Sequence, residues 1–194
     1  MSFDSSLIVQ PTLCHNGMTY GQWAAIWSNW LFSNQNQVGS TFFFRGNVNN
    51  EDKISAINEN HITIKRDAAI FFPIICTISS EEMAPYPSNE MLRRKDCTDP
   101  EQNPVSLYFK INDTEIQELT RYYAESPEFV LEISTDSNLR HLFKPPLKPG
   151  KSRAVSAGYW IMLKPLPGRK YILEFEGVHR DGFRSAGLYH FSVQ

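Results

Sequence analysis

Six basic side chains lie close together between residues 139 and 153 and form the strongest candidate for a functional site. They are Arg140, His141, Lys144, Lys148, Lys151 and Arg153. Prolines at 145, 146 and 149 stiffen this loop, so less conformational entropy is lost when a partner binds. We expect an anionic glycan, a lipid headgroup or an acidic protein surface as the partner. The alternative is that the segment is only a solvent-exposed loop that connects two strands.

Metal chemistry would require histidines that converge through the fold, because their spacing supplies no ligand motif. The five histidines, His15, His61, His141, His179 and His190, form neither an HxH nor an HxxxH pattern. His179 and His190 flank one expected hairpin and are the pair most able to meet. We expect these histidines to be hydrogen-bonded within the protein or exposed at its surface, and we predict no metal and no cofactor.

Nucleophilic catalysis has no recognisable signature in this chain. The Gly-x-Ser-x-Gly elbow is absent, and so is a glycine-rich phosphate loop. Cys14 and His15 are sequence neighbours on an extended segment, so their side chains point to opposite sides. No catalytic residue is therefore predicted. We expect a non-enzymatic binding or interaction module; the alternative is a hydrolase or lyase whose residues converge from distant loops.

Charge is unevenly distributed along the chain. Residues 1–136 hold 9 basic and 18 acidic side chains, whereas residues 137–194 hold 10 and 3. A formal net charge of −2 argues against a dedicated nucleic-acid-binding protein. We expect the acidic and basic parts to interleave in a sheet and neutralise each other across strands.

The three cysteines, Cys14, Cys76 and Cys97, are an odd number without a CxxC pair, which favours reduced thiols. The first residues show no basic region followed by a long apolar run, so we see no signal peptide. No stretch approaches the roughly 20 apolar residues of a membrane span. These features favour a cytoplasmic location. The alternative is that the chain is the mature form of an exported protein.

The element that must organise the fold is a helix predicted over residues 19–33. Thr19 and Gln22 form a capping box at its start. Trp23, Trp27 and Trp30 recur at helical spacing and lie on one face. We expect this face to pack against a sheet; the alternative is a platform on which a ligand stacks.

Most of the remaining chain, residues 41–193, reads as short strands and loops after an extended arm over 1–18. The run 68–78, AAIFFPIICTI, is almost continuously apolar, so both faces of that strand should be covered, and Pro73 should mark a bulge or a sheet edge. Ser88 is expected to cap a short helix that ends near Asp96. The pattern predicts a mainly β protein: one β-sandwich domain over 1–194, jelly-roll or immunoglobulin-like, with an N-terminal amphipathic helix and one short extra helix.

Several short motifs, in this order, carry a resemblance to a known group of proteins. They are GMTYGQW at 17–23, IFFPI at 70–74, SPEF at 126–129, AVSAGYW at 154–160 and YHF at 189–191. With these motifs the chain resembles a family of small, uncharacterised microbial β-sandwich proteins, whose members are often exported. The resemblance implies a fold, and it implies no established activity and no catalytic residue.

Overall fold

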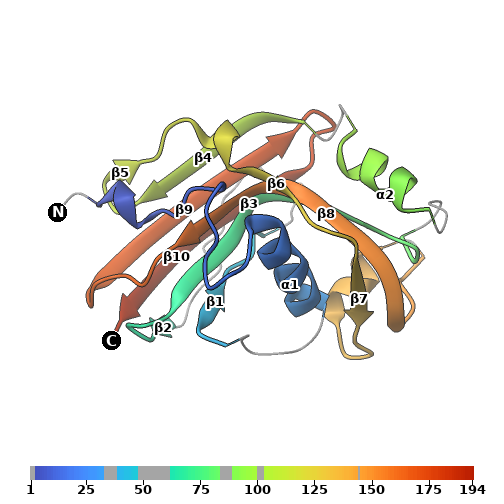
Figure 1. Cartoon of the computed structure of the whole chain (residues 1–194), viewed down its shortest axis with the longest axis horizontal. Coiled ribbons are helices and arrows are strands. Elements are labelled where there is room, and N and C mark those ends of the chain that lie inside the picture. The colour runs from blue at the N-terminus through green and yellow to red at the C-terminus, as the bar shows by residue number, and fades with distance from the viewer. Residues whose placement is uncertain (1–2, 33–38, 48–61, 84–88, 100–102, 144) are drawn as a thin grey trace.

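The computed structural model describes residues 3–32, 39–47, 62–83, 89–99, 103–143 and 145–194. In this part of the chain two five-stranded sheets pack against each other (Figure 1). The first sheet consists, in spatial order, of β1 (Thr41–Phe43), β3 (Ala69–Ser80), β8 (Gly150–Leu163) and β6 (Tyr123–Glu125), with β7 (Phe129–Ile133) also paired to β8. The second consists of β2 (Ile62–Ile64), β10 (Arg184–Val193), β9 (Lys170–His179), β4 (Pro104–Ile111) and β5 (Thr114–Glu115). The predicted mainly β sandwich is confirmed.

The N-terminal helix α1 (Tyr20–Phe32) begins as its sequence predicts. The Thr19 N–H donates to the Gln22 side-chain oxygen at 2.9 Å, and the Gln22 N–H donates to the Thr19 hydroxyl at 3.3 Å. Trp23 and Trp27 are buried, which confirms the packing interpretation for both. Trp30, expected on the same packed face, is only half-buried, and its ring packs against Phe43 of β1.

Strand β3 is the centre of the molecule because both of its faces are covered. On one face Phe71 contacts Tyr20 and Trp23 of α1. On the other, Phe72 contacts Phe109 and Phe175 of the second sheet. The pairing of β3 with β8 shifts register between Pro73 and Ile75, as a residue without an N–H donor requires. Both predictions for this strand are confirmed.

A second helix, α2 (Glu90–Cys97), packs against β8 and β3. Asn89, and not Ser88, is its N-cap: the Asn89 side-chain oxygen accepts from the Met91 N–H at 2.8 Å. Ser88 itself lies outside the described residues. Neither α1 nor α2, nor any other helix that the structure describes, has the length and apolar character needed to cross a membrane.

Hydrogen bonds from α1 also hold β7 at the margin of the first sheet. The Asn29 amide donates to the Val130 carbonyl at 2.9 Å and accepts from the Glu132 N–H at 2.8 Å. Both partners belong to β7, whose other edge pairs with β8. One helix side chain therefore satisfies backbone groups that a further strand would otherwise pair.

Candidate functional site

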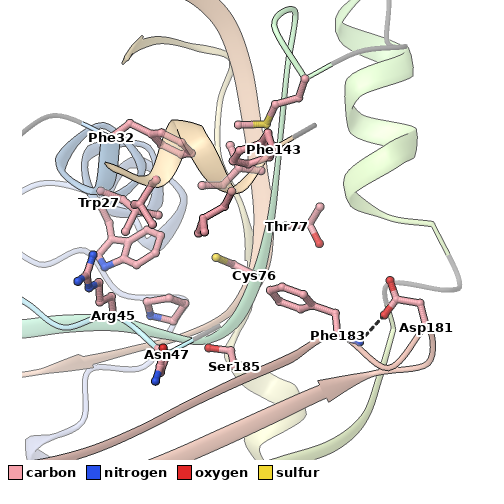
Figure 2. Close-up of a pocket in the computed structure, with 17 residues that line it drawn as sticks. Trp27, Phe32, Arg45, Asn47, Cys76, Thr77, Phe143, Asp181, Phe183 and Ser185 are labelled. Carbon is pink, nitrogen blue, oxygen red and sulfur yellow. Dashed lines mark hydrogen bonds between the residues drawn. The ribbon is translucent and has the colours of Figure 1, made fainter. Parts of the chain in front are cut away.

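A cavity of about 790 Å³ lies along the outer edge of β3, on the side away from β8 (Figure 2). It is bounded by the second half of α1, by residues 139–143 and by the β9–β10 turn. A volume of this size is within the range of small-molecule sites. The cavity is therefore the leading candidate for a functional site.

The cavity exists because β1 leaves β3 early. The two strands pair only from Thr41 and Ala69 to Phe43 and Phe71, whereas β3 continues to Ser80. The chain then crosses to the second sheet, where the Asn47 N–H donates to the Ala186 carbonyl at 2.6 Å. The divergence of these two segments leaves space beside the second half of β3.

Gly46 lies close against β10 at this crossing. A Cβ atom at this position would lie 2.0 Å from the Ser185 hydroxyl oxygen, far closer than real Cβ contacts. Glycine therefore lets the crossing segment lie directly against β10. Both Gly46 and Ser185 line the cavity, so this close contact forms part of its wall.

Most of the cavity wall is apolar. Its apolar side chains come from α1, from β3 and the turn after it, from residues 139–143 and from the β9–β10 turn, and they include Trp27, Leu31, Phe32, Ile78, Met83, Leu139, Leu142, Phe143 and Phe183. The rings of Phe32 and Phe143 are 6.3 Å apart, so the helix end and the 139–143 segment pack together at this wall. Such a surface favours apolar ligand groups, because filling it removes apolar area from water.

Two charged side chains are among the described lining residues and lie at opposite ends of the cavity, and Asn47, Thr77 and Ser185 add neutral polar groups. Figure 2 shows Arg45 and Asn47 at one end and Asp181 at the other. An oxygen of Asp181 accepts from the Phe183 N–H at 2.8 Å, which fixes the turn between β9 and β10. Apolar walls with a few placed polar groups are the usual composition of a binding site.

The backbone of Arg45 is held by the second sheet. The Tyr189 hydroxyl accepts from the Arg45 N–H at 3.3 Å and donates to the Arg45 carbonyl. Burial raises the pKa of Tyr189 to about 12, so this hydroxyl keeps its proton at neutral pH and can donate. The Arg45 side chain is exposed and starts from a fixed backbone.

Cys76 projects into the middle of the cavity (Figure 2). Burial raises the pKa of the Cys76 thiol far above its usual value. The thiolate is the nucleophilic form, so a thiol that stays protonated is a poor nucleophile. Cys76 therefore contributes shape and an apolar surface to the cavity.

The structure does not gather the six predicted basic residues into one loop. The predicted loop 139–153 is too long, because β8 begins at Gly150 and contains Lys151 and Arg153. Arg153 forms an ion pair with Glu81 at 2.8 Å, and Lys151 lies 3.8 Å from Glu132. These pairs join the acidic and basic parts of the chain across neighbouring segments, as expected from the charge distribution.

The other four candidates lie before β8. Arg140 is half-buried and donates to the Leu147 carbonyl at 3.5 Å, while the Leu147 N–H donates back to the Arg140 carbonyl at 3.1 Å. His141 and Lys148 are exposed, and Lys144 lies outside the described residues. The buried Leu147 packs with Phe32 and Leu131, so this segment is anchored to the fold.

The prediction that His179 and His190 are the pair most able to meet is wrong. His190 pairs with Ile172 near the far end of β9, whereas His179 stands at the turn. Seven strand residues at about 3.3 Å each place the two histidines roughly 20 Å apart. Within the described ranges there is no group of three or more His, Cys, Asp or Glu side chains that could hold a metal ion.

His179 is buried and lines a smaller hollow of about 240 Å³ together with Cys97, Tyr123 and Tyr159. Burial lowers the pKa of His179, and the nearby Asp181 opposes this effect in part. Its ring packs at a tilt against the Phe183 ring, with the centroids 5.5 Å apart, so this histidine supports a side chain of the main cavity.

Sequence reasoning missed Arg45, Asp181 and Phe183, because Arg45 is far along the chain from the other two and none of the three belongs to a recognised motif. The available signals were Gly46 directly after an aromatic strand, and Asp181 before Gly182.

Comparison of the chain with protein-family models, with curated proteins and with solved structures gives no significant match in any of the three. The resemblance to microbial β-sandwich proteins stays a prediction, and function is inferred from the cavity.

Proposed function

We propose that this chain is a non-enzymatic binding module that holds a small, largely apolar ligand in the cavity beside β3. The observation that carries this proposal is the apolar wall of a roughly 790 Å³ cavity that includes Trp27, Phe32 and Phe143. The alternative, a hydrolase or lyase, gains no support from the lining, since burial keeps the Cys76 thiol protonated and Asp181 is engaged in its turn.

The test is binding of a neutral apolar dye, Nile red, followed by its fluorescence. Cys76→Phe would place a ring in the middle of the cavity and should weaken binding at least about tenfold by excluding the dye. Cys14→Phe is the matched control, because Cys14 is exposed on the N-terminal arm, and it should bind as the wild type does.

A second measurement does not depend on how well Cys76→Phe folds. Saturating Nile red should slow the reaction of Cys76 with a thiol reagent and leave the reaction of Cys14 unchanged. Absence of binding to the wild type, or equal binding by both phenylalanine variants with no protection of Cys76, would rule out the cavity as the binding site.

A further inference from the structure

We propose that the ligand of this cavity is an anionic amphiphile, whose apolar chain fills the cavity and whose carboxylate-like headgroup meets the Arg45 guanidinium. This inference rests on the proposed function and adds two properties to it: the charge of the ligand and the position of its headgroup. It also moves the expected anion site from the basic segment 139–153 to Arg45.

The first support is the position of Arg45. Among the described residues that line the cavity it is the one basic side chain, and no ion pair to another described residue occupies its guanidinium. Its backbone is fixed by Tyr189, and the chain two residues later is fixed by the bridge between Asn47 and Ala186. An anchored arginine can donate two parallel hydrogen bonds to a carboxylate and loses less entropy in doing so.

The second support is the distribution of the other charges. Asp181 is the one acid among the described lining residues, and Figure 2 places it at the end of the cavity opposite Arg45. Interactions between exposed charges are screened over about 8–10 Å at ordinary salt, so Asp181 opposes an anion at Arg45 only weakly. The wall 139–143 carries Arg140, which adds positive charge near the cavity.

The third support is the apolar surface between these two ends. Side chains such as Trp27, Leu31, Ile78 and Phe143 offer contacts to a hydrocarbon chain and few hydrogen bonds. A small, fully solvated anion would leave this surface unfilled. Each methylene group buried there should tighten binding about fourfold, so affinity should rise steeply with chain length until the cavity is full.

The experiment compares three probes with the same hydrocarbon chain: dodecanoate, 1-dodecanol and dodecyltrimethylammonium, all below their micellar concentrations. Affinity is measured by displacement of Nile red at low and at high salt. The wild type should bind dodecanoate at least about tenfold tighter than 1-dodecanol, and raising the salt should reduce this preference.

The variants test whether the anionic headgroup binds to Arg45 or to the basic segment 139–153. Arg45→Gln should bring dodecanoate to the affinity of 1-dodecanol and leave 1-dodecanol unchanged, whereas Arg45→Lys should keep part of the preference. Lys148→Gln removes an exposed charge outside the lining and should change neither affinity. Because the hydrogen bonds between Arg45 and Tyr189 run through the Arg45 backbone, Arg45→Gln should keep the wild-type melting temperature.

The outcomes distinguish this inference from the proposed function. Equal binding of the acid and the alcohol, tighter binding of the cationic probe, or an unchanged preference in Arg45→Gln would overturn the inference and leave the binding module intact. Loss of the preference in Lys148→Gln would assign the anion to the basic segment and would also overturn it. Failure of all three probes to displace Nile red would also overturn the inference, whereas absence of Nile red binding would remove the proposed function as well.

Discussion

The Tyr20 hydroxyl accepts a hydrogen bond from the backbone N–H of Met162 at 3.0 Å. The same hydroxyl donates to the Val9 carbonyl at 2.6 Å, and the Val9 N–H donates to the Met162 carbonyl at 2.9 Å. One side chain of α1 thus joins the N-terminal arm to β8. Tyr20 is 2% exposed, and burial raises the pKa of its hydroxyl well above the usual value, which keeps the donor intact.

Replacing Tyr20 with Phe should lower the free energy of unfolding by about 1–3 kcal/mol, because it leaves two buried backbone groups without a partner. Urea denaturation measures this change. Tyr123→Phe is the control, since its hydroxyl bonds to Glu125 at the surface, and it should stay within about 0.5 kcal/mol of the wild type. Equal effects of the two variants would contradict the role of Tyr20.

Trp27→Ala should cost about 3–5 kcal/mol, the usual cost of truncating a buried tryptophan. The Trp27 indole N–H donates to the Phe44 carbonyl at 2.7 Å, and its ring packs edge-on against Trp160 at 5.4 Å. Trp30→Ala should cost clearly less, because Trp30 is only half-buried. A stable Trp27→Ala protein in urea denaturation would show that the indole does not support the core.

The three thiols should react at three different rates. Cys14 is exposed and should react at once, Cys76 should react slowly, and Cys97 should react only on unfolding. Burial raises the pKa of Cys97 to about 12, with a smaller contribution from Asp96, so its reactive thiolate is scarce at neutral pH. Thiol titration with mass spectrometry follows each site. Fewer than three thiols in denatured protein would reveal a disulfide instead.

Acidification should destabilise the protein partly through His179. Burial lowers its pKa in the folded state, so the unfolded chain binds the proton more readily. The contribution to stability is fully present above the unfolded pKa of about 6.5 and is lost as the pH falls through the lower folded value.

His179→Gln should therefore flatten the fall in melting temperature between neutral and mildly acidic pH, as followed by circular dichroism. His190→Gln is the control, because its ring is exposed on β10. Retention of the full pH slope in His179→Gln would show that other groups, such as His15, cause the acid sensitivity.

Local sequence signals determined the elements of this fold. The capping box at Thr19 and Gln22 placed the start of α1, because both of its hydrogen bonds lie within one turn. The apolar run around Phe71 and Phe72 showed that both faces of β3 are covered, and Pro73 located the bulge. In each case the physical cause lies within a few residues of the signal, so the sequence alone was sufficient.

Tertiary structure alone decided the site. Arg45, Cys76, Phe143 and Asp181 are far apart in the chain, and they share a cavity only because β1 leaves β3 and crosses to β10. The basic residues that are close in sequence were separated for a similar reason, since the pairing of β8 begins at Gly150 and carries Arg153 to Glu81. Strand pairing between distant segments sets these positions, and spacing along the chain does not encode it.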